Sequence, residues 1–420
     1  LQKSFYVLFL RGIATISSLG LNVLITRTFG STGAGIYFAS LSYQRLIILF
    51  TTGGYLPYTA RLVAESLDKK KKEINAFLGS VIRLILGTGI VILSFVLAGS
   101  FLFRNLSFFE IPIHGLILFI VITAISWSIL RLIANAFKGA RSPFRSMLLE
   151  QNFFPIILIL VLIFSYFITN KIFSFSFLLL AYAIIMIGLV IIAIFLWNAE
   201  HPKIKIPFNL KGLSSKDELW NPSIKKFFQL NMVVVLQNNL PYYAIPLIGT
   251  VQEVGHFGVA YRLIMIVNMI ILSLSSIFNP IFVGEFKRSD FSSLKRLLKQ
   301  TQWISILTYL PFFFVFLFWG NWLVSIFGKD FTESIPLLKI LAVAQLVNAS
   351  TGLSGHLLNM IKLEKLSLIS WVAAFVFSLI FIPVLGLKWG IIGITIGFSC
   401  GTVIRNLLMY GLVKKRLKNA

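Results

Sequence analysis

The residues in this chain with the clearest chemical potential are arginines inside long apolar segments. Arg45 lies nine residues from the end of its segment, which at the helical rise corresponds to a depth of about 14 Å in an apolar layer about 30 Å thick. Arg11 and Arg262 would lie about 9 Å and 8 Å deep. An arginine near the middle of a membrane costs at least ~2.5 kcal/mol, so it should face a cavity or a partner.

Acidic partners for these arginines are almost absent. Glu150 is the one carboxylate within an apolar segment. Four other arginines fall within one or two turns of the predicted cytoplasmic face, where their side chains can extend to the lipid headgroups: Arg61, Arg83, Arg131 and Arg405. One carboxylate cannot neutralise six or seven arginines, so any cavity in the bundle is predicted to be cationic.

A cationic cavity favours an anionic substrate, and the planar guanidinium of arginine can donate two hydrogen bonds to a phosphate. We therefore expect Arg45 first, then Arg11 and Arg262, to contact such a group, with Arg83 and Arg131 as further candidates. Exporters of drugs and cations need several intramembrane carboxylates, and this sequence lacks such a set. Glu150 is the candidate for ion coupling; the alternative is a carboxylate in a salt bridge at the membrane rim.

Polar residues and helix breakers occur in the same segments as the arginines. The polar ones are Asn22, Gln237, Asn238 and Asn239, and the predicted helix breaks are Gly53, Gly54, Pro57, Pro241 and Pro280. Broken backbone at membrane depth is tolerated where it is buried in protein or lines a wet cavity. The segments at 5–25, 36–64, 227–248 and 257–284 are therefore expected to line a central path. The alternative is that these small and polar residues serve helix packing.

The composition indicates that transmembrane helices position these arginines and polar residues. Hydrophobic residues make up 57% of the 420 residues and charged residues only 12%, whereas soluble domains carry about 25% charge. The sequence predicts an all-α polytopic membrane protein with twelve transmembrane helices. The apolar runs fall at roughly 5–25, 36–64, 77–103, 112–136, 146–168, 175–197, 227–248, 257–284, 303–320, 335–358, 367–385 and 391–412.

The distribution of basic residues predicts the orientation. With both termini cytoplasmic, 25 Lys and Arg residues fall on the cytoplasmic side and 5 on the other, as the positive-inside rule requires. The net charge of +24 thereby needs no nucleic-acid partner. The predicted domains are an N-terminal six-helix bundle at 1–197, a cytoplasmic linker at 198–226 and a C-terminal six-helix bundle at 227–420.

Motifs for enzymatic or metal chemistry are missing from the sequence. It has no phosphate-binding loop, no H-E-x-x-H and no C-x-x-C, and its single cysteine, Cys400, can form no intrachain disulfide. We expect no cofactor, no metal site and no enzymatic activity. A membrane glycosyltransferase is the alternative, although such an enzyme would usually carry polar catalytic residues on a sizeable extramembrane loop. The first apolar segment shows no cleavage site and is expected to be a retained helix.

Several loose motifs, in order along the chain, resemble those of polysaccharide repeat-unit flippases. The segment 27–37 reads RTFGSTGAGIY, and 135–141 reads NAFKGAR. Similar strings are VGHFGVAYR at 254–262, FGKDF at 327–331, and IPVLG at 382–386 followed by WGIIG at 389–393. Each motif alone is weak, but their conjunction spans nearly the whole chain. It resembles the Wzx-type O-antigen flippases, in the superfamily that also holds the multidrug and toxic-compound exporters.

This resemblance implies transport of an undecaprenyl-pyrophosphate-linked oligosaccharide from the cytoplasmic to the periplasmic leaflet of the bacterial inner membrane. It further implies ion-coupled alternating access between two six-helix bundles, and a polysaccharide polymerase and chain-length machinery as partners besides the membrane lipids. The anionic pyrophosphate agrees with the arginine argument, which does not depend on the resemblance. The alternatives are a peptidoglycan-precursor flippase and a cation or drug antiporter of the same superfamily.

Overall fold

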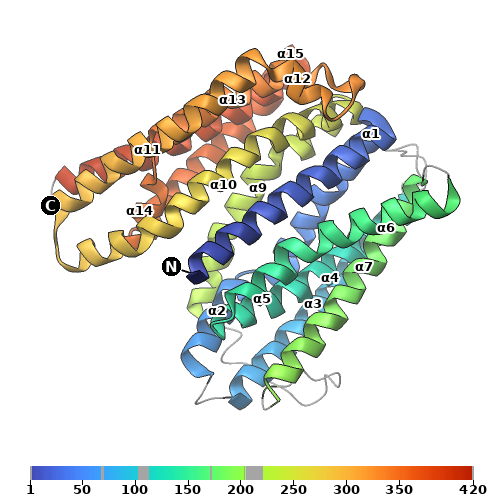
Figure 1. Cartoon of the computed structure of the whole chain (residues 1–420), viewed down its shortest axis with the longest axis horizontal. Helices are drawn as coiled ribbons and strands as arrows, with labels where there is room; N and C mark the ends of the chain where they lie inside the picture. Colours follow the sequence, from blue (N-terminus) through green and yellow to red (C-terminus); the bar gives the residue numbers. More distant parts are fainter. Residues whose placement is uncertain are drawn as a thin grey trace. The chain divides into compact units, whose positions relative to one another are not determined.

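A computed structural model describes residues 2–67, 71–102, 113–170, 173–202, 204 and 221–418, and these residues form helices and connecting turns with no strand among them (Figure 1). The N-terminal helices are α1 (Gln2–Thr52), α2 (Tyr55–Ser66), α3 (Lys71–Leu102), α4 (Ile113–Gly139), α5 (Pro143–Met147), a π-helix (Leu148–Asn152), α6 (Phe153–Thr169) and α7 (Phe175–Glu200). The C-terminal ones are α9 (Pro222–Ile248), α10 (Val251–Lys287), α11 (Phe291–Phe318), α12 (Gly320–Ser325), a 3-10 turn (Lys329–Phe331), α13 (Ser334–Ser350), α14 (Ser354–Met360) and α15 (Glu364–Lys418).

The two longest helices, α1 and α15, are each interrupted at a glycine. Gly30 has φ 64° and ψ −164°, and Gly390 has φ 56° and ψ −140°. These values lie outside the helical region, and the positive φ is one that glycine adopts without steric cost. Each of these elements is therefore two helices joined by a sharp bend.

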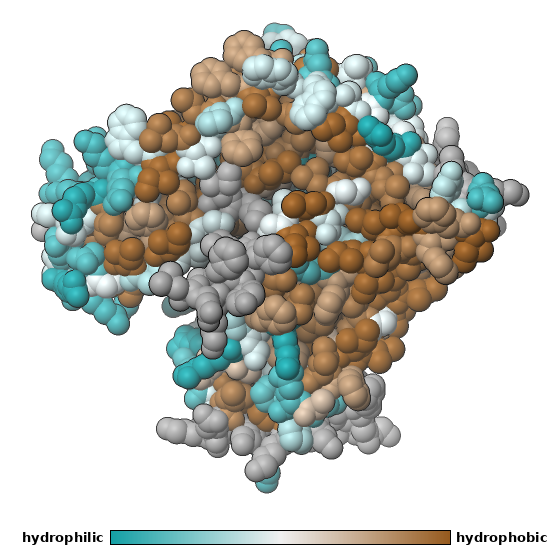
Figure 2. Space-filling model, in the orientation of Figure 1, coloured by the Kyte–Doolittle hydropathy of each residue, from teal (hydrophilic) through white to brown (hydrophobic). Residues whose placement is uncertain are grey.

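Apolar helices dominate the described part of the chain. Seven helices are long and apolar enough to cross a membrane, or eight if α13 and α14, which meet at 45°, count as one broken span. Large apolar side chains such as Phe164, Phe195 and Phe318 are exposed, and brown hydrophobic surface covers much of the face in Figure 2. Long apolar helices that expose such side chains are typical of segments that face lipid. The chain is a multi-pass membrane protein.

The helices divide into two compact units. The first comprises Leu1–Leu24 with Ser40–Val235, and the second Ile25–Ala39 with Leu236–Ala420. In the first unit α4 contacts α2, α3 and α7, and in the second α13 contacts α10, α11 and α15. The sequence-based boundaries at 197 and 227 therefore differ from the compact units in detail, and most of the 198–226 linker lies outside the described residues.

The bend around Gly30 belongs to the second unit because of close backbone packing. A Cβ atom at Gly35 would collide with the carbonyl oxygen of Val251, and one at Gly255 would collide with that of Ser31. Arg27 adds a hydrogen bond of 2.7 Å from its Nε to the Ile326 carbonyl oxygen. Glycines in the two segments 27–37 and 254–262 thus let α1 and α10 approach each other closely.

The two halves of α15 pack against each other through a row of glycines. Gly393, Gly397 and Gly401 lie four residues apart on the second half, against Leu385, Ile382 and Ser378 of the first half. A Cβ at Gly397 would lie 3.0 Å from the Ile382 backbone nitrogen. Small residues at this spacing let two membrane helices pack closely.

We expect Gly393→Ala to destabilise this hairpin by roughly 1–3 kcal/mol, because the added methyl group would collide with the Leu385 carbonyl oxygen. The matched control is Gly411→Ala in the same helix, where nothing lies within 4 Å of the added Cβ. That change should be neutral or slightly stabilising, since alanine is the better helix former. Unfolding in detergent measures both, and equal stability of the two variants would contradict the packing argument.

Helix starts in the second unit are fixed by side-chain caps. Thr250 and Glu253 form a reciprocal capping box at the start of α10. Asp290 caps α11 by accepting a hydrogen bond of 2.8 Å from the Ser293 backbone N–H. That bond holds the pKa of the Asp290 carboxyl below its usual value.

The predicted helix breaks are realised at the glycines but not at the prolines of the second unit. Helix α1 ends at Thr52, the chain turns at Gly53 and Gly54, and Pro57 lies in the first turn of α2. In contrast, α9 continues through Pro241 and α10 through Pro280. The prediction of breaks at Pro241 and Pro280 was therefore wrong. A proline removes one ladder hydrogen bond, but neighbouring helices in a membrane bundle can hold the helix together around it.

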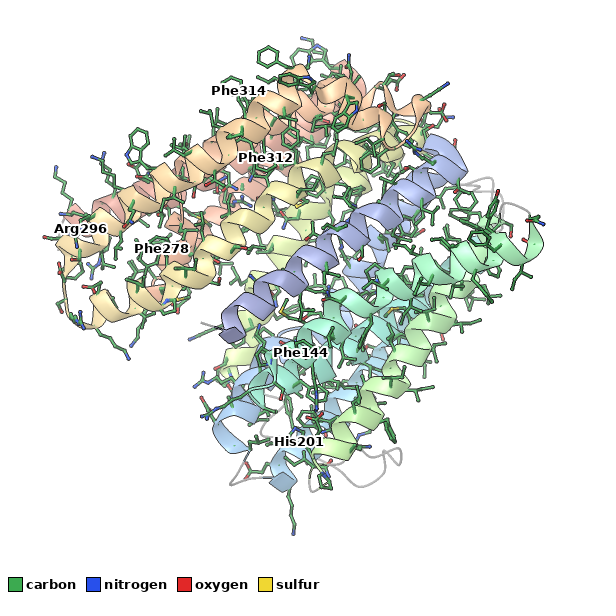
Figure 3. The ribbon with its side chains drawn as sticks, in the orientation of Figure 1. Phe144, His201, Phe278, Arg296, Phe312 and Phe314 are labelled. Atoms are coloured by element: carbon green, nitrogen blue, oxygen red, sulfur yellow. The ribbon has the colours of Figure 1, made fainter. Side chains whose placement is uncertain are left out.

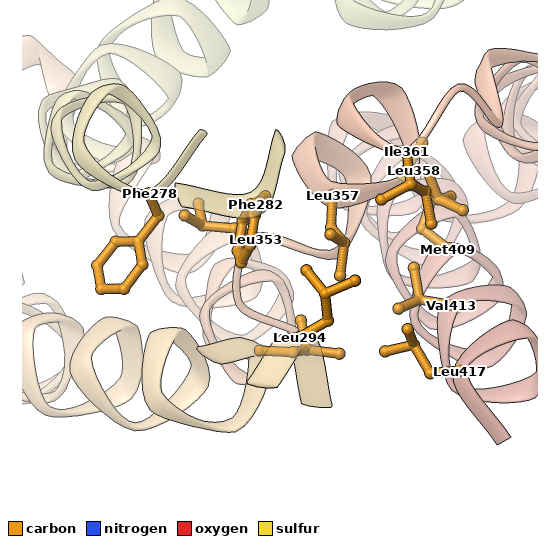
Figure 4. Close-up of a cluster of buried hydrophobic side chains, with 11 residues drawn as sticks. Phe278, Phe282, Leu294, Leu353, Leu357, Leu358, Ile361, Met409, Val413 and Leu417 are labelled. Carbon is orange, nitrogen blue, oxygen red and sulfur yellow. The ribbon is translucent and has the colours of Figure 1, made fainter. Parts of the chain in front are cut away.

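One hydrophobic cluster holds α10, α11, α14 and α15 together at one end of the second unit (Figure 4). Phe282, Leu294, Leu357 and Val413 in this cluster are fully buried. Arg296 lies near the same end of α11, whereas Phe312 and Phe314 lie further along that helix (Figure 3). The cluster therefore packs these four helices together at the end of the unit where Arg296 lies.

Candidate functional site

A cavity of about 350 Å³ lies inside the second unit. Its walls come from α9, α10, α13, α14 and both halves of α15. The polar lining residues are Asn238, Asn268, Gln345, His356, Ser399, Thr402 and Arg405, and the aromatic ones are Tyr261, Trp371 and Phe398. Because its lining residues range from Asn238 to Arg405 in the sequence, the cavity exists only in the folded unit.

Arg405 is the one lysine or arginine in the wall of this cavity, and no carboxylate lines it. Its guanidinium carbon lies 4.1 Å from the centre of the Trp371 ring, a cation–π contact. Its Nη2 lies 3.4 Å from Oδ1 of the adjacent Asn406. Within the described residues it makes no ion pair with a carboxylate, so its positive charge has no acidic counterpart there.

A chain of amides crosses the cavity wall between α13 and α10. Asn348 Nδ2 donates to Gln345 Oε1 at 3.3 Å, and Gln345 Nε2 donates to Asn268 Oδ1 at 2.7 Å. Asn268 Nδ2 in turn lies 3.3 Å from the Met265 sulfur. Each amide has its orientation fixed by its neighbour, which gives the wall a defined set of donors and acceptors.

A second cavity of about 240 Å³ shares Arg405, His356 and Trp371 with the first. Three buried polar atoms in the walls of the two cavities lack a hydrogen-bond partner in the described part of the chain: Oγ of Ser399, Nδ2 of Asn406 and Oδ1 of Asn359. Ser399 and Asn406 are each 6% exposed. Leaving a buried polar atom without a hydrogen-bond partner costs folding free energy. These three atoms are therefore available to hydrogen-bond with a ligand in the cavities.

The first unit contains a different polar region, between α4 and α7. The indole N–H of Trp127 donates to the Tyr182 hydroxyl at 2.9 Å, and the ring of Phe154 packs 4.3 Å from that of Tyr182. The guanidinium carbon of Arg131 lies 5.4 Å from the centre of the Trp127 ring. Arg45, half-buried in α1, is close enough to Tyr182 to act on it electrostatically, as is Arg131. The fold thus brings two of the predicted arginines to one aromatic cluster.

Glu150 lies in the π-helix Leu148–Asn152, directly before α6. Its Oε1 is 3.9 Å from Nε of Arg131, so the pair is a loose salt bridge. Asn152, at the end of the same π-helix, donates to the Leu10 carbonyl oxygen at 2.8 Å and is buried. Single π-turns within α-helices occur frequently at functional sites. This irregularity was not predicted from the sequence.

The remaining predicted residues have other surroundings. Arg11 is half-buried and one of its guanidinium nitrogens has no partner among the described residues. Arg83 donates to Ser80 of its own helix at 3.1 Å. The guanidinium carbon of Arg262 lies 5.2 Å from the centre of the Phe38 ring, and Arg262 does not line the cavity.

Among the predicted polar residues, only Asn238 lines the cavity of the second unit. Asn22 donates to the Ser18 carbonyl oxygen of its own helix at 2.7 Å. Gln237 is buried and donates to Ser378 at 3.0 Å, and Asn239 is also buried. In the part of the chain that the structure describes, no three His, Cys, Asp or Glu side chains come together as metal ligands.

The sequence analysis missed six of the seven polar residues that line this cavity: Asn268, Gln345, His356, Ser399, Thr402 and Arg405. Arg405 was expected to extend to the headgroups, whereas its guanidinium lies over Trp371 in the cavity wall. Helical rise gives depth but not the direction in which a side chain points, so the sequence could not separate these two placements. The available signal was the occurrence of Asn268 and Gln345 within apolar runs, since polar side chains in membrane helices mark functional paths.

Comparisons with solved structures identify the fold. An inward-facing multidrug resistance MATE family transporter of the MOP superfamily aligns with a TM-score of 0.73 at 15% identity, over 97% of this chain and 95% of that one. The lipid II flippase MurJ in an inward closed conformation gives 0.69 at 19% identity, over 97% and 87%. A MOP superfamily transporter from Pyrococcus furiosus gives 0.62 at 14%, over 99% and 94%. No protein-family model and no curated protein matches the sequence. The chain has the fold of MOP-superfamily transporters.

Proposed function

We propose that this protein is a flippase that moves an undecaprenyl-pyrophosphate-linked oligosaccharide, such as an O-antigen repeat unit, from the cytoplasmic to the periplasmic leaflet. The premise is the fold of MOP-superfamily transporters, which include drug exporters as well as a lipid II flippase. The sign of the charges within the helices supports the choice among these substrates.

The observation that carries the proposal is the excess of arginine over carboxylate inside the helices. Six arginines lie away from the helix ends: Arg11, Arg45, Arg83, Arg131, Arg262 and Arg405. Among the described residues Glu150 is the one carboxylate in a comparable position, and Arg131 lies beside it. A site of this charge would repel cations and attract a pyrophosphate. We assign the pyrophosphate contact to Arg45, with Arg11 and then Arg262 as further contacts, and the coupling proton or ion to Glu150.

The proposed topology has twelve membrane helices with both termini cytoplasmic. Splitting α1 at Gly30 and α15 at Gly390 supports this number, as does the excess of basic residues in the loops assigned to one side. We place the protein in the bacterial inner membrane, where a polysaccharide polymerase and chain-length machinery would use the translocated unit.

Two other substrates of the same fold remain candidates. MurJ is named as a flippase of lipid II. Lipid II, like the proposed substrate, is an anionic saccharide linked to a lipid. The multidrug transporter favours a drug or cation, but the charges of this chain count against it. For the MOP superfamily transporter from Pyrococcus furiosus, the reverse polarity of its binding pocket suggests a different function, which supports inferring the substrate class from charge.

Translocation in proteoliposomes tests the proposal. The purified protein is reconstituted with a fluorescent polyprenyl-pyrophosphate oligosaccharide, and a membrane-impermeant quencher reports the label in the outer leaflet. We expect protein-dependent exchange between leaflets, and no exchange of an uncharged polyprenyl glycoside. The control variant is Arg61→Gln, since Arg61 is exposed and paired with Glu65.

The outcomes separate the candidate functions. Exchange of lipid II but not of the oligosaccharide lipid would identify a peptidoglycan-precursor flippase. Efflux of a cationic dye without exchange of either lipid would identify an antiporter and refute the charge argument. Sugar transfer from a nucleotide-sugar donor would identify a glycosyltransferase.

A further inference from the structure

We infer that the cavity around Arg405 in the second unit is a saccharide site for a sugar that carries one anionic group. The inference rests on the proposed function, because the sugar would belong to the glycan of the lipid-linked substrate. The sugar site is separate from the arginines assigned to the pyrophosphate, and it selects a sugar with an anionic substituent.

The charge of the cavity favours an anionic ligand. The guanidinium carbon of Arg405 lies over the Trp371 ring, 4.1 Å from its centre, and the cavity has no carboxylate in its wall. One of its nitrogens, Nη2, makes a long contact of 3.4 Å with Asn406 Oδ1, and the other N–H groups of the guanidinium can donate to a carboxylate or phosphate. Arg405 is half-buried, and a charge partly withdrawn from water without a counterion is costly, so an anionic ligand stabilises the site and a cation is disfavoured.

The neutral groups of the wall fit hydroxyl groups better than a bare anion. Asn238, Asn268 and Gln345 contribute amides, each of which can both donate and accept, as a sugar hydroxyl does. The Asn268 and Gln345 oxygens each accept one hydrogen bond within the wall, and the second lone pair of each can accept from a sugar hydroxyl but not from an inorganic anion, which only accepts. Ser399 adds a buried hydroxyl without a partner in the described chain.

The apolar part of the wall and the size of the cavity also fit a sugar ring. The rings of Tyr261 and Phe398 lie 5.8 Å apart at 71°, and both line the cavity together with Trp371. Aromatic walls of this kind give the C–H face of a sugar ring an apolar surface. A volume of about 350 Å³ falls in the range of pockets for small organic ligands, roughly 300–1,000 Å³, and is far more than a lone ion needs.

Binding of matched sugars to the purified full chain in detergent tests the inference. The probes are glucuronate, glucose 1-phosphate and glucose, with acetate and inorganic phosphate as free anions, all at constant ionic strength. Saturation-transfer NMR and thermal unfolding report the binding. We expect at least one charged sugar to bind tenfold or more tightly than glucose and than its own free anion. The preference between glucuronate and glucose 1-phosphate then shows whether the anionic group is a carboxylate or a phosphate.

Variants separate the role of Arg405 from general charge effects. Arg405→Gln should lower the affinity for the charged sugar at least tenfold, to the level of glucose, whereas Arg405→Lys should give a smaller loss. Arg288→Gln is the matched control, because Arg288 is exposed and paired with Glu285 in the same unit; it should bind like the wild type. If Arg405→Gln does not fold, the comparison of charged and neutral sugars on the wild type still tests the inference.

Three results would overturn the inference. The first is equal binding of charged and neutral sugars to the wild type, and the second is equal binding of the preferred charged sugar to the wild type and folded Arg405→Gln. The third is that neither charged sugar binds more tightly than its own free anion, acetate for glucuronate and phosphate for glucose 1-phosphate. The lipid exchange assay keeps the two proposals apart. Exchange without charged-sugar binding would remove this site and leave the flippase. Charged-sugar binding without exchange of any lipid would remove the flippase and leave the site.

Discussion

Replacing Arg45 by glutamine is expected to reduce lipid exchange at least tenfold at subsaturating substrate. Arg45 is half-buried in α1 and lies within electrostatic range of Tyr182 in the aromatic cluster. A hydrogen bond to a charged group contributes about 1.5–3 kcal/mol, and each 1.4 kcal/mol corresponds to a factor of ten in affinity. The measurement is the initial rate of exchange in proteoliposomes as a function of the concentration of the pyrophosphate lipid.

Arg45→Lys distinguishes charge from shape at this position. Lysine keeps the positive charge but loses the planar fork, so we expect it to retain more activity than glutamine and less than arginine. Arg61→Gln serves as the control for loss of a positive charge elsewhere in the first unit. Equal loss in the lysine and glutamine variants would refute an electrostatic role for Arg45, as would wild-type exchange in the glutamine variant.

Replacing Glu150 by glutamine is expected to abolish gradient-driven accumulation of the substrate in one leaflet while exchange without a gradient persists. Glu150 lies in a π-helix, 3.9 Å from Arg131, and it is the carboxylate best placed within the described helices to exchange a proton or ion. Glutamine keeps the shape of the side chain but cannot change its charge. The measurement compares net translocation with and without an imposed proton or sodium gradient.

The double variant Arg131→Gln with Glu150→Gln tests whether the pair is only structural. Removing one partner of an ion pair leaves the other charge uncompensated, whereas removing both relieves that penalty. If the double variant restores gradient-driven transport that the single Glu150 variant lacks, the pair serves stability rather than coupling. Loss of gradient dependence in both variants supports coupling through Glu150.

For the candidate site, the sequence predicts the sign of the charge but not the placement of the individual arginines. The arginine excess and the scarcity of carboxylates are properties of the sequence, and so the anionic class of substrate could be proposed before the fold was known. Which of the arginines lie in the same part of the fold could not be predicted from the sequence. Arg45 and Arg131 lie near Tyr182, Arg262 packs on Phe38, and Arg405 lines the cavity of the second unit. These placements depend on the direction of each side chain around its helix, which a linear pattern of apolar residues specifies only weakly.

Local backbone features were predictable to different degrees. The turn at Gly53 and Gly54 follows from their sequence, whereas Pro241 and Pro280 lie within continuous helices. The outcome at a proline depends on whether neighbouring helices hold the flanking turns in place. The π-helix at Glu150 likewise has no sequence signal, because it depends on how the flanking helices pack.

The sequence by itself determined that this protein is an all-helical membrane protein whose interior charges are mostly positive. The physical reason is that a bilayer offers no hydrogen bonds to the backbone, so long apolar segments must become helices whatever their neighbours. Only the tertiary structure decided that residues 25–39 pack with the second unit and that α9, α10, α13, α14 and α15 together line a cavity around Arg405. Such features arise from contacts between residues far apart in the chain, and these contacts form only when specific side chains and glycines let the helices approach closely.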